Sequence, residues 1–130
     1  MPRKVFEAFT RLDASDVNTY LSNEVTLSSS AAAGTYTVAT ADRYKTLMFT
    51  ASSAVTVSIG TATAFEPGER VDILRDGAGT VTISRASTAV TFSGRGTAGT
   101  AYAIGTRYDA VTVLCVDTNS YRVIGNATVV

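Results

Sequence analysis

The sequence contains no histidine and no tryptophan, and its 130 residues include one cysteine and two prolines. Without histidine the chain lacks the usual general base, every histidine-containing catalytic triad and the common zinc ligand sets. The single cysteine, Cys115, cannot form a disulfide within the chain and is expected to pack as a small core side chain in the apolar run 111–116. These absences point away from an enzyme and toward a protein that acts through its surfaces.

The chain has no excess of positive or negative charge, because its 11 basic and 11 acidic residues give a formal net charge of zero. Phosphate backbones attract proteins with a basic patch, so no nucleic-acid partner is expected. No segment approaches the roughly 20 apolar residues of a membrane-spanning helix, and the start of the chain lacks the apolar stretch of a signal peptide. We therefore expect a protein made in a cytoplasm, with no membrane partner and no cofactor.

Two patterns resemble sites of chemistry. Glu66, Glu69, Asp72 and Asp76 lie close together in sequence, but a glycosidase needs two carboxyl groups that face each other across a cleft. Solvated strand and turn positions are the simpler interpretation of these acidic residues. Residues 94–99 (GRGTAG) match the spacing G-x-G-x-x-G, but strand and turn, not a helix, are expected to follow, which indicates a mobile loop. Neither pattern predicts a catalytic or cofactor site.

Threonine and valine are abundant from residue 24 onward, in short alternating runs separated by turn residues. This spacing predicts an all-β protein with an antiparallel sandwich or jelly-roll-like body, and a thin barrel fits almost as well. Because alanine and valine make up much of the apolar content, the core is expected to be thin and to need a partner surface. The expected strands are 25–28, 35–39, 46–50, 54–59, 70–75, 80–84, 89–92, 101–104, 110–116 and 121–124.

Turn residues and a recurring fragment refine this expectation. Asp-Gly is a strong turn dipeptide, so Asp76-Gly77 predicts a hairpin between residues 71–75 and 80–84. A second hairpin is expected across residues 117–120. The fragment Ala-Val-Thr-Val/Phe recurs at unequal spacing, which we interpret as excluding a solenoid; its copies lie at 54–57, 89–92 and 110–113.

Residues 1–25 are expected to form a separate docking arm with a short helix, ahead of a β body at 26–130. The helix is placed within residues 12–25, with Asp13 as its N-cap. A helix of about ten residues is marginal alone in water, so its apolar stripe needs the β body or another protein to cover it. The apolar residues expected to form this docking or oligomer interface are Val5, Phe6, Phe9, Leu12, Val17, Tyr20 and Leu21.

Together, the two regions resemble small virion proteins of tailed bacteriophages, especially phages of actinobacteria. Residues 4–6 (KVF) and 12–21 (LDASDVNTYL) are similar to an opening common in minor tail proteins. The β region resembles a module of phage tail and fibre proteins at Ser53–Val57, Phe65–Gly68, Asp76–Ile83 and Tyr121–Gly125. The sequence departs from this pattern at Asp13, where threonine is usual, and at Tyr121, where tryptophan often stands.

This resemblance implies a non-enzymatic virion protein, commonly a homotrimer, whose N-terminal segment docks onto other virion proteins. We expect a minor tail or tail-fibre-like component, with a capsid decoration protein or head fibre as the alternative. A third possibility is a module that binds a carbohydrate or receptor on the host surface through a platform of tyrosines. Aromatic residues in strands are more often packing partners; the tyrosines lie at 20, 36, 44, 102, 108 and 121.

Overall fold

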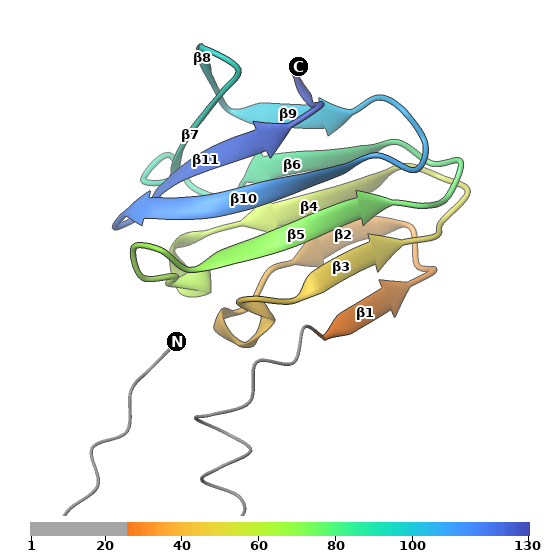
Figure 1. The fold of residues 1–130 in the computed structure, drawn as a ribbon, viewed down its shortest axis with the longest axis horizontal. Helices are drawn as coiled ribbons and strands as arrows, with labels where there is room; N and C mark the ends of the chain where they lie inside the picture. The colour runs from red at the N-terminus through yellow and green to blue at the C-terminus, as the bar shows by residue number, and fades with distance from the viewer. Residues whose placement is uncertain (1–25) are drawn as a thin grey trace, which may run out of the picture.

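The computed structural model describes residues 26–130, which form two facing β-sheets (Figure 1). The expected N-terminal helix and all seven candidate docking residues, from Val5 to Leu21, lie outside the described residues. The strands are β1 (Leu27–Ser30), β2 (Gly34–Thr37), β3 (Thr46–Phe49), β4 (Val55–Ile59), β5 (Arg70–Arg75), β6 (Val81–Arg85), β7 (Thr91–Gly94), β8 (Thr97–Gly99), β9 (Ala101–Ile104), β10 (Ala110–Asp117), β11 (Ser120–Gly125) and β12 (Thr128–Val129). Two 3-10 turns, η1 (Thr40–Asp42) and η2 (Thr61–Thr63), complete the described elements and confirm an all-β protein.

The first six strands wind as a coil of three turns, because successive strands alternate between the two sheets (Figure 1). β1, β3 and β5 pair in parallel in the seven-stranded sheet, and β2, β4 and β6 pair in parallel in the five-stranded sheet. The turns differ in length, since Leu27 lies opposite Thr46 in one turn and Thr46 lies opposite Asp72 in the next, longer one. The strands therefore stay in register while the loops between them vary.

This arrangement corrects two predictions. The expected all-β sandwich is confirmed, but the expected antiparallel pairing holds for only half of it, because five of the ten strand pairings within residues 26–130 are parallel. The exclusion of a solenoid is wrong for residues 27–85, since unequal spacing does not prevent stacking. A parallel ladder requires only that the paired stretches align, and the loops that carry η1 and η2 absorb the extra residues.

The hairpin expected at Asp76-Gly77 is also wrong, because β5 and β6 lie in different sheets. Their loop crosses between the sheets and stacks on the preceding crossing, between β3 and β4. The N–H of Gly77 donates to the Phe49 carbonyl at 2.9 Å, and the N–H of Gly79 donates to the Ala51 carbonyl at 3.0 Å. A Cβ on Gly77 would lie 2.2 Å from the Ala51 oxygen. Glycine here permits close approach of two loops.

The last six strands close the coil mainly with antiparallel pairs, although β7 and β11 pair in parallel. β10 pairs with β5 and β9 pairs with β6, so both strands of the third turn gain a neighbour of opposite direction. The predicted hairpin across residues 117–120 is confirmed as the β10–β11 connection. The predicted loop at 94–99 is instead the β7–β8 hairpin, in which Arg95 and Gly96 have φ values of 50° and 77°. Two successive positive φ angles suit the right-handed twist of a tight hairpin.

The core lies between the sheets and is built from alternate residues of each strand. In β4, for example, Val55, Val57 and Ile59 are at most 2% exposed, while Thr56 and Ser58 are only half-buried. This period of two is the pattern of a strand with one face in a core.

Large aromatic side chains are part of the core between the sheets. The rings of Tyr102 and Tyr121 contact Phe92 edge-on at centroid distances of 6.4 and 6.0 Å. Valine is frequent in the buried cluster of the described residues, but alanine contributes only Ala51 and Ala127 to it. The expectation of a core made mainly of alanine and valine is therefore right about valine and wrong about alanine. Buried aromatic rings contribute large areas and favourable edge contacts.

Candidate functional site

The four clustered carboxylates do not form a facing pair with an evident catalytic role. Glu69 is 5% exposed, accepts the N–H of Glu66 at 2.7 Å and lies 3.4 Å from the Arg43 guanidinium. Asp72 accepts the Thr112 hydroxyl at 2.5 Å. The interpretation of these residues as solvated is thus wrong for Glu69, whose carboxylate fixes the loop before β5. Within residues 26–130, no group of three or more histidine, cysteine, aspartate or glutamate side chains could hold a metal ion.

The buried side chain of Arg75 connects two loops at one end of the sandwich. Arg75 is 9% exposed and donates to the carbonyls of Ile104, Gly105 and Ala78 at 3.0, 2.7 and 2.7 Å. Its Nε has no partner within the described part of the chain. The guanidinium thus ties the β5–β6 loop to the β9–β10 loop. This role is structural, because every hydrogen bond of the guanidinium goes to a backbone carbonyl and so holds the two loops in place.

The single cysteine and its tyrosine neighbour are also structural. Cys115 is 1% exposed, as predicted, and its thiol lies 3.2 Å from the Phe65 and Asp117 carbonyl oxygens. Burial raises the pKa of the Cys115 thiol, which disfavours the reactive thiolate. Burial raises the pKa of Tyr121 to about 12. Both groups belong to the core.

The tyrosines do not assemble into a stacking platform in the described residues. Tyr102 and Tyr121 are at most 1% exposed, and Tyr36 packs edge-on against Phe49 at 5.4 Å between centroids. Tyr108 is 66% exposed, and the Arg107 guanidinium lies 4.7 Å from its ring centroid. The prediction that strand tyrosines serve as packing partners holds for the first three.

Among the described residues, no helix has the length and hydrophobicity that a membrane-spanning helix needs.

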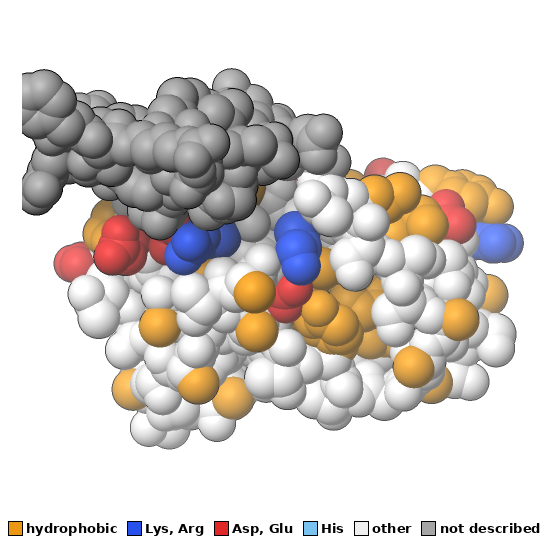
Figure 2. All heavy atoms as spheres, turned by 90° about the horizontal axis from the view of Figure 1, so that it is seen from below, with side chains coloured by type: hydrophobic (Ala, Val, Ile, Leu, Met, Phe, Trp, Pro, Cys, Tyr) orange, Lys and Arg blue, Asp and Glu red, His pale blue; other side chains and the backbone are white. Residues whose placement is uncertain are grey.

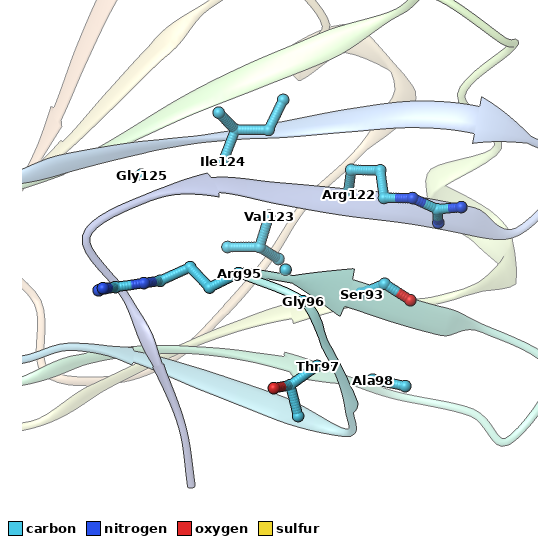
Figure 3. A pocket seen from close by; sticks show the side chains of 10 residues that line it. Ser93, Arg95, Gly96, Thr97, Ala98, Arg122, Val123, Ile124 and Gly125 are labelled. Carbon is cyan, nitrogen blue, oxygen red and sulfur yellow. The ribbon is translucent and has the colours of Figure 1, made fainter.

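A shallow groove of about 510 Å³ lies between the β7–β8 hairpin and β11 (Figure 3). Arg95 and Arg122 extend toward its opposite ends (Figure 3), and no acidic side chain is among the lining residues. Arg95 donates to the side-chain oxygen of Asn126 at 3.0 Å, and the Asn126 amide donates to Asp109 at 3.0 Å. The lining residues thus combine two arginines with the hydroxyl groups of Ser93 and Thr97, and the arginines give the groove a positive local charge.

Among residues 26–130, no strand pairs with the outer edges of β1 and β2, which lie at the same end of the two sheets (Figure 1). The carbonyls of Thr26 and Ser30 accept the N–H groups of Thr46 and Thr50 at 2.9 Å, so even-numbered residues of β1 bond to β3. Backbone groups alternate in direction along a strand. The N–H and C=O of Leu27 and Ser29 therefore point away from the sheet.

The edge of β2 is open in the same way. Gly34 and Val38 donate their N–H groups to the carbonyls of Ala54 and Ser58 at 3.2 and 2.9 Å, which leaves the backbone groups of Thr35 and Thr37 pointing away from β4. We call this end of the coil, with the outer edges of β1 and β2, the open end.

Side chains that face inward at the open end are incompletely covered. Ser28, Ser30 and Tyr36 are half-buried, whereas Leu47 and Phe49 in the next turn are at most 2% exposed. Figure 2, seen from this end, shows hydrophobic side chains at the surface beside a basic and an acidic group. A further layer of chain would bury them.

The open end also lacks the protection that edge strands usually carry. β1 (Leu-Ser-Ser-Ser) and β2 (Gly-Thr-Tyr-Thr) contain no charged residue and no proline, which are common devices against unwanted strand pairing. The opposite edges are formed by the still shorter strands β8 and β12. The open end is therefore the surface of the described body best suited to take up another strand.

No protein-family model, no curated protein and no solved structure matches this chain.

Proposed function

We propose that this protein is a non-enzymatic structural component of a bacteriophage virion, a trimeric minor tail or tail-fibre-like subunit anchored by residues 1–25. The observation that carries the proposal is the open end, where two uncharged sheet edges and half-buried inward side chains lie next to the point at which residues 1–25 join β1. A surface of this kind is stabilised by a protein neighbour. The resemblance of the sequence to phage tail and fibre modules supports this choice of assembly.

The roles of the buried polar groups support a scaffold. Glu69, Arg75 and Tyr121 all lie in the interior, and the contacts of Glu69 and Arg75 go to loops of the same body. Perturbed or buried titratable groups are often functional when they line a cleft. Here they lie among packed loops and rings, where their effect is to hold loops and fill space.

A capsid decoration protein or head fibre would use the same open end to bind the shell. The number of copies per particle distinguishes a position on the capsid shell from a position on the tail. Decoration of a shell takes hundreds of copies, whereas a tail tip takes a few. Quantitative mass spectrometry of purified particles, scaled to the major capsid protein, measures this number.

One observation favours the second candidate function, recognition of the host surface. The groove between the β7–β8 hairpin and β11 carries Arg95 and Arg122 without an acidic lining residue, which suits an anionic glycan. Binding of the purified protein to host cell walls should then weaken in Arg95→Ala and Arg122→Ala, while Arg107→Ala, outside the groove, should bind normally. Equal binding by all three variants would remove this candidate.

Truncation tests the leading proposal. Removal of residues 1–23 should leave a soluble body with the same β-rich circular dichroism spectrum, because the core cluster lies within residues 38–127. Light scattering should show a trimer for the full chain, and the truncated chain should no longer enter particles in a complementation assay. A truncated chain that enters particles normally would refute the anchor, and a monomeric full chain would refute the trimer.

A further inference from the structure

We infer that the outer face of the seven-stranded sheet is the surface through which copies of this chain contact one another. The inference rests on the proposed function, because it supplies the interface of the proposed trimer and leaves the open end for the rest of the particle. In Figure 1 the strands β3, β5 and β10 of this sheet lie nearer the viewer than β4 and β6 of the other sheet. The occupant of the outer face is a second copy of the same chain.

The outward side chains of the two sheets differ in kind. In the five-stranded sheet, the paired strands β2, β4 and β6 direct only hydroxyl side chains outward, at Thr35, Thr37, Thr56, Ser58, Thr82 and Ser84. In the seven-stranded sheet, large apolar side chains occupy outward positions of five strands, at Leu27, Met48, Leu74, Leu114, Val116 and Ile124. Of these two faces, the second offers apolar surface to a neighbour.

The apolar side chains of this face are incompletely covered in a single subunit. Leu27 and Ile124 are 59% and 53% exposed. Beside Ile124 the face has a hollow of about 400 Å³, whose lining includes Leu74 and Ala110. Leu74 lies opposite Met48 in the β3–β5 ladder. A side chain of a neighbouring copy that fills the hollow would take these apolar groups out of water.

The width of the face suits three copies around a common axis. The outward residues of β5 extend from Arg70 to Leu74, which makes the face roughly 17 Å wide at about 3.3 Å per residue. Three faces of that width, closed into a triangular prism, each lie about 5 Å from the axis, which is half of the roughly 10 Å between packed sheets. Side chains can therefore fill the centre of a three-fold arrangement without leaving a channel.

The area of the face is also sufficient. The five strands that carry the apolar side chains span roughly 24 Å at about 4.8 Å between neighbours, so each copy contributes roughly 410 Å². Three copies contribute roughly 1,200 Å², which is the lower end of the range that specific protein interfaces bury. Because a pleated face has more accessible area than its flat outline, this value is a minimum.

The charges on the face also suit contact with a second copy. Asp72 is half-buried and accepts the Thr112 hydroxyl, and a carboxylate that a neighbour covers needs a cation close by. Arg70 is exposed at the adjacent outward position of β5. In the prism, the edge of one face that carries Arg70 lies beside the edge of the next face that carries Leu74. The arginine of one copy can therefore reach toward Asp72 of the next.

A charge placed on the apolar face tests the contact. In Ile124→Lys, each trimer would bury three ammonium groups, so the concentration at which it dissociates should rise roughly a hundredfold or more. Because Ile124 is 53% exposed in one subunit, the variant should keep its β-rich circular dichroism spectrum. Thr56→Lys, on the outer face of β4, is the matched control and should leave the trimer unchanged. Light scattering of the full-length chains over a range of concentrations measures this, and equal dissociation of both variants would overturn the inference.

Oxidation of Met48 by hydrogen peroxide gives a second measurement that needs no substitution. Met48 is half-buried in one subunit and would be covered in the trimer. Its conversion to the sulfoxide should therefore be roughly tenfold or more slower at concentrations where the trimer forms than where it has dissociated. Mass spectrometry of the peptide that contains Met48 measures the rate. A rate that does not depend on concentration would show that no second copy covers the face, and would overturn the inference.

The outcomes separate this inference from the proposed function. A trimer that persists in Ile124→Lys and enters particles would overturn the inference and leave the virion role intact. A trimer that dissociates in Ile124→Lys, but whose unchanged form does not enter particles, would support the contact and refute the virion role. A dimer that is lost in Ile124→Lys would support the contact and refute the proposed trimer. A monomer in which Met48 becomes protected only inside particles would assign the face to a different virion protein and overturn the inference.

Discussion

Replacement of Gly79 by alanine tests whether the crossing loops stack as the coil requires. A Cβ on Gly79 would lie 2.0 Å from the carbonyl oxygen of Ser53 and 3.0 Å from that of Ala51. Both atoms belong to backbone, so neither can move aside as a flexible side chain would. The loops must separate, and the hydrogen bond from the Gly79 N–H to the Ala51 carbonyl, 3.0 Å long, is strained or lost.

The magnitude follows from two contributions. Overpacking of a close contact costs about 1–3 kcal/mol, and loss of one hydrogen bond costs about 1 kcal/mol. We expect Gly79→Ala to lower the free energy of unfolding by about 3 kcal/mol. With a urea dependence of about 1.5 kcal/mol/M for a domain of this size, the unfolding midpoint should fall by about 2 M.

Gly105→Ala is the matched control. No atom would lie within 4 Å of its Cβ, and Gly105 has no positive φ, so its free energy of unfolding should change by less than about 0.5 kcal/mol. Urea unfolding followed by circular dichroism measures both variants. Equal stability of Gly79→Ala and Gly105→Ala, with an unchanged urea dependence, would show that the two loops do not stack. The hairpin that the sequence predicts between β5 and β6 would then be the better description.

Three further predictions concern the interior. Arg75→Met should lower the free energy of unfolding by about 2–4 kcal/mol in urea, because three carbonyls lose their donors; full stability would refute the clamp between the loops. Tyr121 has a folded pKa of about 12 against 10 unfolded, so the unfolded state releases the proton first and stability should fall as pH rises from 10 to 12. Tyr121→Phe should flatten that fall without loss at pH 7, as unfolding at several pH values would show. Cys115 should react with a thiol reagent at least about a hundredfold more slowly in the native protein than in urea, and rapid native labelling would contradict its burial.

Strand positions were predictable from the sequence, because alternation is local. The runs 70–75 and 101–104 were placed with the bounds that the structure has, since each is flanked by turn residues. β1 was placed too early, at 25–28, as its serines carry no apolar alternation. β8 and β12 were missed because they are too short to show a pattern. The β7–β8 hairpin has only a weak local signal, because Gly96 suits a positive φ whereas arginine rarely adopts the one that Arg95 has.

Strand partners were not predictable, because a half-buried strand looks the same whichever strand pairs with it. Asp76-Gly77 illustrates this limit, since the same dipeptide suits a hairpin turn and a close crossing of loops. The burial of Glu69 and Arg75 depends on carbonyls and side chains from loops far away in sequence. The open end follows from the order of strands in both sheets, which local patterns do not encode. The need of residues 1–25 for a covering surface remains a prediction.

The antiparallel closure gives the molecule a direction. β9 and β10 pair in antiparallel direction with β6 and β5, so they cover the edges of the last winding. A further winding after residue 85 would have to break both of these pairings. An added winding fits ahead of β1 or between the existing windings. Longer versions of this architecture should therefore differ from it by additional windings in or before the stretch 27–85, each similar in length to the stretch 27–46 or 46–72, while the carboxy-terminal half keeps a constant size.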